Sequence, residues 1–321
     1  MIKRSREWGM KRTVFSGIPG IAAGFLFVFS VGLLLSCTKP APAAPKVVIA
    51  PLQLLINTDT TLNFFHDMIL QGNDAALVGT APVTLVAPVD PALLAAGYTL
   101  AIIDSLPAYI ADGFVRYAFI SSAITSSPVV NSPYNTALGI PVYLTQDSLS
   151  NVYFNGVRAV RDTAAAGNSV VYKLQGLIPT PFDSLQALLA ADSNYTLLAE
   201  ALLQTGLYDS LGTGSFTLLA PDNNAFVNAG YPTITSIDSS NLPALGNLLK
   251  YQVVTGLFFT NNLPAVTGLP TLEGETISVG AQNGIPFFTG KNNSSPANLL
   301  SGNLLAGSNI VVHKTDQLLQ P

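Results

Sequence analysis

Few residues in this chain have the chemistry that catalysis or metal binding requires. The 321 residues include one cysteine, Cys37, and two histidines, His66 and His313. Two histidines without a free thiol cannot form a zinc site of ordinary composition, although carboxylates could still bind a hard cation. No loop shows the spaced Asp, Asn and Glu residues that enclose Ca²⁺. We therefore expect no metal and no other cofactor.

Motifs for enzyme chemistry are also missing from the sequence. No G-x-S-x-G motif offers a nucleophilic serine. Residues 284–291 superficially suggest a phosphate-binding loop, but five residues separate the glycines where four are needed, and Asn292 replaces the Ser or Thr that binds Mg²⁺. The acidic residues are scattered, so spacing alone identifies no catalytic carboxylate pair. The sequence therefore predicts a protein that is not an enzyme.

The N-terminus has the features of an export signal. Five basic residues among the first twelve precede an apolar run, residues 14–35, which is followed by Ser36 and Cys37. Such a run alone could be an uncleaved membrane anchor. The cysteine directly after a small residue instead resembles a bacterial lipobox, which predicts a signal peptide over residues 1–36 and lipidation of Cys37. Thr38 is not the Asp of the usual inner-membrane retention signal, so we expect an outer-membrane lipoprotein that faces the cell surface or the periplasm.

Residues 37–51 are rich in proline and alanine, a composition that favours an extended tether over a packed core. Five of the 14 Lys and Arg residues and one of the 18 acidic residues lie in the first 36 positions. The remaining chain thus has 9 basic and 17 acidic residues, a net charge of −8. This charge argues against nucleic acid or anionic headgroups as partners. The abundant neutral polar residues suit hydrogen bonding to glycans or protein backbones.

The rest of the chain contains an internal repeat. Residues 84–88 read TLVAP and residues 217–221 read TLLAP, and an Ala-Gly-Tyr triplet follows each stretch at the same distance. The offset from position 84 to position 217 is therefore the same as the offset between the two tyrosines, at positions 98 and 231. Solenoid repeats are only about 20–50 residues long, so this much longer period indicates a duplicated domain. We expect one domain over residues 52–180 and another over residues 181–321.

Each copy of the repeat begins with helical patterns and ends with strand patterns. In the second copy, residues 196–203 have apolar positions at helical spacing, and residues 216–220 have the pattern of a short buried strand. Asp222 or Asn223 can cap the short helix that follows, and Asp90 is the candidate cap in the first copy. Residues 276–279 and the stretch from 308 onward have strand patterns. This order predicts an α+β fold.

Three blocks of the second copy resemble the fasciclin domain. They are residues 216–226 (FTLLAPDNNAF), 248–254 (LLKYQVV) and 309–319 (NIVVHKTDQLL), and their order and spacing both match. The first copy resembles a divergent fasciclin domain, in which Pro91, Leu93 and Tyr172 replace Asn224, Phe226 and His313. The resemblance implies two tandem β-wedge domains with packed helices, in a surface or extracellular protein that mediates adhesion rather than catalysis.

Some animal members of this family have a Tyr-His pair in the middle block that is tied to receptor binding. The corresponding pairs here are Tyr251-Gln252 and Tyr117-Ala118, so that activity is not carried over. We expect Tyr251 to be a core aromatic residue with a hydrogen-bonded hydroxyl. His313 and Asp316 belong to the closing block, and we expect a structural role for them, with His313 fixing the last strand by a hydrogen bond.

An Asp followed by Ser or Thr, and then by an apolar residue or Thr, recurs along the chain. This triplet resembles the O-glycosylation acceptor of Bacteroidetes periplasmic proteins, although such pairs are also ordinary in turns and helix caps. The candidate acceptors are Thr60, Ser105, Ser148, Thr163, Ser184 and Ser210.

Together these features predict a cell-envelope lipoprotein that acts as an adhesion or binding module for a protein or glycan ligand, with the lipid on Cys37 as its contact with the membrane. Two alternatives remain open. One is a structural or scaffolding partner of a periplasmic or outer-membrane complex. The other is a glycan-active enzyme that no motif reveals.

Overall fold

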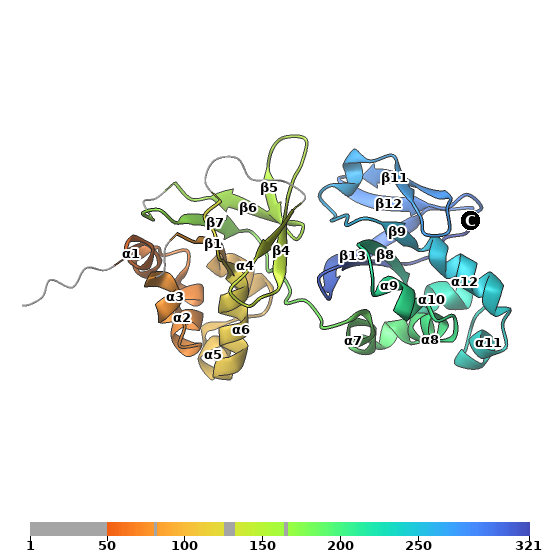
Figure 1. The fold of residues 1–321 in the computed structure, drawn as a ribbon, viewed down its shortest axis with the longest axis horizontal. Helices are drawn as coiled ribbons and strands as arrows, with labels where there is room; N and C mark the ends of the chain where they lie inside the picture. The colour runs from red at the N-terminus through yellow and green to blue at the C-terminus, as the bar shows by residue number, and fades with distance from the viewer. Residues whose placement is uncertain (1–49, 80–81, 125–131, 164–165) are drawn as a thin grey trace, which may run out of the picture. The chain divides into compact units, whose positions relative to one another are not determined.

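The computed structural model describes residues 50–79, 82–124, 132–163 and 166–321 (Figure 1). The predicted signal peptide, Cys37 and nearly all of the predicted tether lie outside the described residues. Among the residues that are described, no helix combines the length and the apolar character needed to span a bilayer. The described residues belong to one compact unit, in which two similar halves follow each other.

The first half runs from helices into strands, with one short strand among the helices. Its helices are α1 (Pro51–Thr58), α2 (Asn63–Gln71), α3 (Ala75–Gly79), α4 (Asp90–Ala95), α5 (Leu100–Ser105) and α6 (Ala108–Ala118). Its strands are β1 (Thr84–Pro88), β2 (Phe119–Ile120), β3 (Ser132–Asn135), β4 (Pro141–Gln146), β5 (Val152–Phe154), β6 (Val157–Arg161) and β7 (Val170–Leu174).

The second half repeats this order. Its helices are α7 (Leu185–Ala190), α8 (Thr196–Gln204), α9 (Leu207–Leu211), α10 (Asn223–Asn228), α11 (Ile234–Asp238) and α12 (Leu242–Tyr251), with 3₁₀ turns at Ser193–Tyr195 and Leu263–Ala265. Its strands are β8 (Phe216–Pro221), β9 (Val253–Thr255), β10 (Gly268–Pro270), β11 (Thr276–Gln282), β12 (Ile285–Thr289), β13 (Ala297–Ala306) and β14 (Ile310–Thr315). The α+β prediction is confirmed.

Both sheets have the same topology and both curl until their ends meet. The strand order is β2-β1-β7-β6-β5-β4-β3 in the first half and β9-β8-β14-β13-β12-β11-β10 in the second. Only the pairs β1–β7 and β8–β14 are parallel among the strand pairs described. Bridges between Ile120 and Thr136, and between Val254 and Thr271, join the first strand of each order to the chain just after the last. Each sheet is therefore nearly closed.

Side-chain caps fix several helix starts, and they test two predictions. Asp222 accepts a hydrogen bond from the backbone N–H of Ala225 (2.9 Å) and caps α10, so the first of the two predicted candidates is confirmed, and Asn223 is the first residue of the helix. The prediction for Asp90 is wrong, because α4 already includes this residue. The Asp90 carboxylate instead accepts from the backbone N–H of Phe64 (2.9 Å) and so ties α4 to α2.

Each half has two apolar clusters, one between its helices and its sheet and one inside the curl of the sheet. In β8, Leu218 faces the helices while Leu219 faces the interior of the curl, because successive side chains of a strand point to opposite faces. In β1, Leu85 and Val86 are divided in the same way. These strands are therefore buried on both faces, which explains their nearly continuous apolar sequences.

A few side chains connect the two halves within the compact unit. Tyr143 of β4 donates a hydrogen bond to the carbonyl oxygen of Ser308 (2.5 Å), and its ring centre lies 5.9 Å from that of Phe259. The hydroxyl of Thr145 donates to the Asn261 side chain (3.1 Å). These contacts bury the Tyr143 side chain, which is 9% exposed.

Candidate functional site

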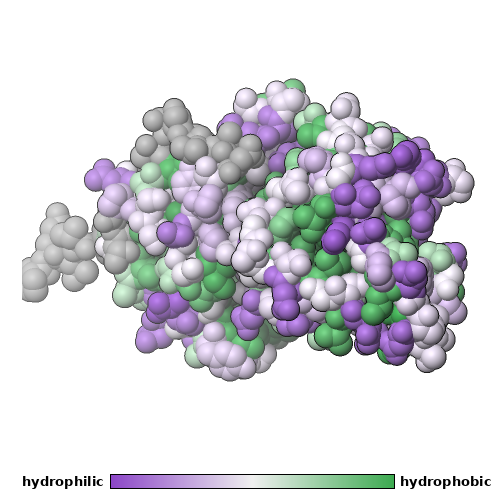
Figure 2. Space-filling model, turned by 45° about the vertical axis from the view of Figure 1, so that its right-hand side comes forward, coloured by the Kyte–Doolittle hydropathy of each residue, from purple (hydrophilic) through white to green (hydrophobic). Residues whose placement is uncertain are grey.

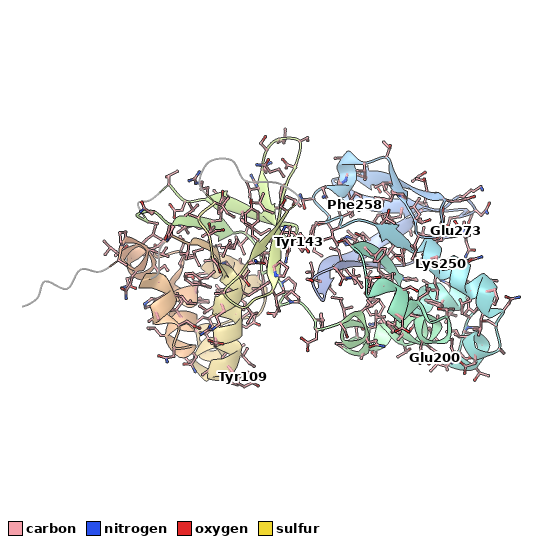
Figure 3. The ribbon with its side chains drawn as sticks, in the orientation of Figure 1. Tyr109, Tyr143, Glu200, Lys250, Phe258 and Glu273 are labelled. Carbon is pink, nitrogen blue, oxygen red and sulfur yellow. The ribbon has the colours of Figure 1, made fainter. Side chains whose placement is uncertain are left out.

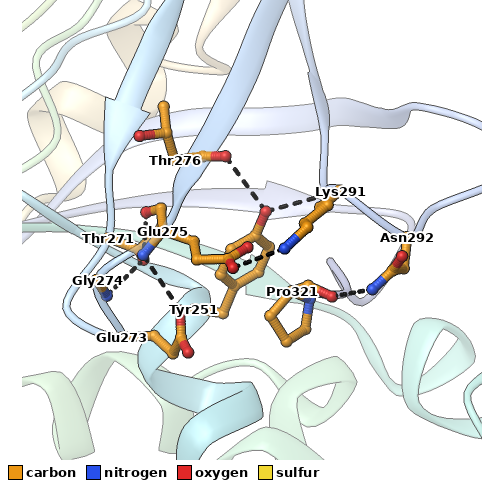
Figure 4. Close-up of polar contacts among 9 residues, drawn as sticks. All are labelled: Tyr251, Thr271, Glu273, Gly274, Glu275, Thr276, Lys291, Asn292 and Pro321. Atoms are coloured by element: carbon orange, nitrogen blue, oxygen red, sulfur yellow. Dashed lines mark hydrogen bonds and ion pairs between the residues drawn. The ribbon is translucent and has the colours of Figure 1, made fainter.

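Tyr251, the tyrosine of the middle fasciclin block, ends α12 and is fully buried inside the curl of the second sheet. Its hydroxyl donates a hydrogen bond to the carbonyl oxygen of Thr276 (3.4 Å) and accepts one from the backbone N–H of Lys291 (3.2 Å; Figure 4). Burial raises the pKa of this hydroxyl. The ring is therefore part of the core, and its polar end connects β11 to the turn after β12.

Charged side chains lie at the surface near this buried hydroxyl. Lys291 Nζ and Glu275 Oε1 form an ion pair at 2.7 Å, with the two side chains 61% and 43% exposed (Figure 4). The Glu273 carboxylate accepts a hydrogen bond from the backbone N–H of Glu275 (3.2 Å). An exposed pair of this kind contributes little to stability, because water screens the two charges. The group offers polar contacts to a partner but has no nucleophile paired with a base.

Gln252 follows Tyr251 and is also fully buried. Its side-chain amide donates hydrogen bonds to the carbonyl oxygens of Leu248 (2.9 Å) and Leu319 (2.8 Å), and its carbonyl oxygen accepts from the backbone N–H of Leu319 (3.0 Å). The amide thus pairs with the C-terminal segment as a neighbouring strand would. The sequence shows only that no histidine stands at this position, and it does not reveal this role.

His313 lies in β14 and is fully buried. Its Nε2 is 2.8 Å from the carbonyl oxygen of Phe258, and its Nδ1 accepts a hydrogen bond from the backbone N–H of Asn303 (3.3 Å). These partners assign the proton to Nε2 of a neutral ring. Burial lowers the pKa of His313 to about 4. Gly302 packs so close that a Cβ there would lie 2.4 Å from Nδ1, so this position requires glycine.

Asp316 has a separate role from His313. Its two carboxylate oxygens accept hydrogen bonds from the backbone N–H and the side-chain amide of Asn298, each at 2.7 Å. These bonds join the chain just after β14 to the start of β13. Tyr251, His313 and Asp316 thus share the second half but do not converge on one cavity.

An ion pair recurs at equivalent positions of the two halves. In the second half, Lys314 Nζ of β14 lies 3.2 Å from Asp192 Oδ2. In the first half, Lys173 Nζ of β7 contacts Asp59 at 2.6 Å and Asp162 at 2.9 Å. These pairs were not predicted, although Asp59 and Asp192 are separated by the offset of the repeat, which is the sequence signal that could have revealed them.

The candidate glycosylation acceptors lie in turns and at helix ends. Ser184 is half-buried and accepts a hydrogen bond from the backbone N–H of Ala187 (3.1 Å), so it caps α7. The remaining acceptors are exposed: Thr60, Ser105, Ser148, Thr163 and Ser210. Their positions leave glycosylation a prediction, because exposed turns also suit the ordinary use of Asp-Ser and Asp-Thr pairs.

The surface of the described residues carries no concentrated group of metal-binding side chains. Within the described parts of the chain, no three His, Cys, Asp or Glu residues lie close enough to hold a metal ion. Hydrophobic side chains form small patches between hydrophilic ones on the face drawn in Figure 2. Tyr109, which is 76% exposed near the start of α6, projects away from the helices (Figure 3).

Comparison with known proteins identifies the second half. The Fasciclin domain family matches residues 193–321. Transforming growth factor-beta-induced protein ig-h3 from Sus scrofa is 29% identical over 171 residues, which are 53% of this chain and 24% of that protein. Periostin from Homo sapiens is 24% identical over 214 residues, 64% of this chain and 24% of that protein. The chain spans about a quarter of the length of these relatives.

A bacterial relative and a solved structure extend the comparison. Protein sll1735 from Synechocystis sp. is 32% identical over 95 residues, 29% of this chain and 71% of that protein. A FAS1 domain pair from the insect cell adhesion molecule Fasciclin I covers 81% of this chain and 97% of its own, at a TM-score of 0.40 and 14% identity. With its Fasciclin domain at residues 193–321, the chain belongs to the fasciclin-domain family.

Proposed function

We propose that this protein is an envelope lipoprotein that acts as an adhesion or binding module through its fasciclin domain. The observation that carries the proposal is the fasciclin domain itself, whose polar motif residues are used inside the fold. Tyr251, His313 and Asp316 each make internal hydrogen bonds, so they stabilise the domain and leave recognition to its surface. A protein or glycan is the ligand class that suits this mixed, mostly neutral polar surface.

The anchoring part of the proposal rests on the sequence before residue 52. Lipidation of Cys37 would attach the chain to the outer membrane, and the Pro-rich tether of residues 37–51 would hold the two halves away from the bilayer. The net charge of −8 after the leader would keep the domains off anionic headgroups. A lipidated tether and a binding domain together suit contact between the cell and a surface or a neighbour.

Anchoring is tested by a single substitution at the lipidation site. Cells that produce the chain, or its Cys37→Ala variant, are fed an alkyne-labelled fatty acid and fractionated. The wild-type chain should carry the label and sediment with the outer membrane. The variant should lose the label, keep its leader uncleaved and leave the outer-membrane fraction. Equal labelling of both chains would contradict lipidation of Cys37.

Adhesion is tested on the same cells in two measurements. Protease treatment of intact cells, followed by detection with an antibody against residues 181–321, should remove the signal if the domains face outward. Attachment of these cells to protein-coated and glycan-coated surfaces should fall at least several-fold when residues 181–321 are deleted. Protection from protease until the outer membrane is opened would contradict outward adhesion and favour an envelope partner. Turnover of envelope polysaccharide by the purified chain would contradict a non-catalytic role.

A further inference from the structure

A cavity occurs at the same place in both halves. In the second half it encloses about 280 Å³ between the start of α7, the end of α9 and the loop before β14. In the first half it encloses about 230 Å³ between the start of α1, the end of α3 and the loop before β7. Ser184 and Gly212 line the second cavity, and their equivalents in the repeat, Pro51 and Gly79, line the first. The duplicated fold therefore carries a duplicated cavity.

The linings of the two cavities differ in chemistry. Asp183, Tyr208 and Asp209 line the cavity of the second half. The equivalent positions of the first half are all alanines, namely Ala50, Ala75 and Ala76. Gln186 lines the second cavity as well. The fold thus tolerates alanine at these three positions, and the second half has two carboxylates and an aromatic ring there that the architecture does not require.

The polar groups of the second cavity are free to bind a ligand. Within the described chain, the carboxylates of Asp183 and Asp209 and the side-chain amide of Gln186 make no hydrogen bond or ion pair, whereas Ser184 and Asn309 use side-chain atoms inside the fold. These free groups come from three places: the residue before the cap of α7, α7 itself and α9. They are exposed side chains on separate elements around one hollow.

The charge of the second cavity specifies the ligand that fits it. Its lining includes two carboxylates and no Lys, Arg or His. Tyr208 is half-buried, and its hydroxyl donates to the carbonyl oxygen of Ala199 (3.4 Å), which fixes the ring beside the hollow. A planar cation suits this lining, because guanidinium has five N–H donors that pair with carboxylates and a flat face that stacks on aromatic rings.

The size of the cavity narrows the ligand further. Pockets for drug-sized molecules enclose about 300–1,000 Å³, and this hollow is slightly smaller. One long side chain fits such a space, whereas an oligosaccharide would extend beyond it. We propose that the cavity lined by Asp183, Tyr208 and Asp209 captures an arginine side chain that projects from a partner protein. This assignment rests on the binding function proposed above and specifies the chemistry of its ligand.

The proposal is tested by titrating the full chain, labelled with ¹⁵N, with N-acetyl-arginine N-methylamide. The backbone amide signals of Gly212 and Gly307, which line the cavity, should shift in a saturable manner. The corresponding citrulline compound has the same shape without the charge, and it should leave both signals unmoved. Affinity for the arginine compound should fall with added salt, because charge pairing drives the contact.

Matched variants separate the cavity from the overall charge of the protein. The triple variant Asp183→Ala, Tyr208→Ala, Asp209→Ala installs the residues of the first half and should weaken arginine binding at least tenfold. The double variant Asp104→Ala, Asp238→Ala removes the same number of exposed carboxylates elsewhere and should bind as wild type does. A chemical-shift map of the unliganded triple variant, unchanged away from the cavity, confirms that it is folded.

Several results would overturn the assignment. Equal shifts with citrulline, full binding by the triple variant, or shifts caused by methyl glucoside or Ca²⁺ but not by arginine would each do so. Cell attachment is measured alongside the titration. Attachment without arginine-induced shifts would reject the arginine site and leave the binding function standing. Shifts at the cavity amides in a chain that never supports attachment would reject adhesion and leave the arginine site standing.

Discussion

In the first half, Tyr172 and Ala118 occupy the places that His313 and Gln252 occupy in the second. The correspondence is set by register, since Tyr172 pairs with Val86 of β1 as His313 pairs with Leu219 of β8. The paired residues are buried in both halves. Of these four described residues, His313 and Gln252 form side-chain hydrogen bonds to distant segments, and Tyr172 and Ala118 form none. The topology thus depends on apolar burial, and the polar contacts are additions that each half has made separately.

The first half has a buried polar group of its own. Asp74 is 2% exposed and lies 3.3 Å from the guanidinium of Arg116, with Asp112 nearby. Burial and the neighbouring Asp112 raise the pKa of Asp74 to about 6. At the equivalent position of the repeat, the second half has the buried Leu207. The same backbone accepts either a carboxyl group or a leucine here, at different electrostatic cost.

The strongest test concerns the shared apolar frame, by which we mean the buried apolar side chains at equivalent positions of the two halves. Phe226 and Leu93 are such a pair, and both are fully buried. Phe226→Ala should lower the free energy of unfolding by about 3–5 kcal/mol, and Leu93→Ala by about 2–5 kcal/mol, because each leaves a cavity in the core. Val227→Ala, at a site 45% exposed, should change it by about 0.5 kcal/mol or less. Urea unfolding measures all three. If only one of the two core substitutions lowered the free energy of unfolding, the two halves would not share an apolar frame.

Lowering the pH should destabilise the second half and stabilise the first half. The pKa of His313 is lowered from 6.5 to about 4, so the folded second half prefers the neutral ring. Its contribution to stability is complete above pH 6.5 and is lost as the pH falls towards 4, by about 3 kcal/mol. Asp74 has a pKa that folding raises from 3.8 to about 6. Its contribution to stability is therefore complete below pH 3.8 and is lost as the pH rises through about 6.

The two halves can be compared in one experiment on the full chain. Hydrogen exchange of backbone amides in β8 and β1, corrected for intrinsic rates, should show that β8 loses protection and β1 gains it between pH 6.5 and pH 4.5. Asp74→Asn should remove the dependence of β1 and leave that of β8 unchanged. Parallel loss of protection in both strands would show that these two groups do not control the acid response.

A smaller effect is expected at Gln252. Gln252→Ala installs the residue that the first half has at Ala118, but it leaves the backbone N–H and carbonyl of Leu319 without their partners. Because buried groups are left unsatisfied, the substitution should lower the free energy of unfolding by about 1–3 kcal/mol. It should also speed up hydrogen exchange at the backbone amide of Leu319. Gln282→Ala, at an exposed site, is the matched control and should be neutral. Unchanged protection at Leu319 would show that other contacts hold the C-terminal segment.

The sequence predicted the apolar frame better than the polar contacts. The repeat, the strand pattern of residues 216–220 and the cap at Asp222 depend on local spacing, which a single sequence displays directly. Asp90 precedes an expected helix and so matches the pattern of a cap, but its carboxylate instead reaches α2, which lies far from it in the sequence. Gln252 and the cavity lined by Asp183 and Asp209 require knowledge of which distant segments meet, and periodicity carries no such information.

The smallest expected effect concerns the ion pairs of Lys173 and Lys314. Burial alone would raise the pKa of Asp59, but the hydrogen bonds of Lys173 and Thr61 hold this pKa below its ordinary value. The low pKa of Asp192 depends first on the backbone N–H of Asn194, which remains when Lys314 is removed. Lys173→Met should therefore lower the free energy of unfolding by about 1 kcal/mol, because it leaves Asp59 and Asp162 facing each other. Lys314→Met should lower it by about half as much.

Double-mutant cycles distinguish these pairs from simple loss of packing. The coupling of Lys173→Met with Asp59→Asn should exceed that of Lys314→Met with Asp192→Asn, and both should shrink at 1 M salt because screening weakens partly exposed pairs. Lys314 also lies 5.1 Å from the ring centre of Tyr195, a contact that salt affects less once it is desolvated. If the two coupling energies were equal and independent of salt, the apolar stems of the lysines, and not their charges, would hold β7 and β14 to the helices. The recurrence of Asp59 and Asp192 at one offset would then reflect only the turns that these two residues form.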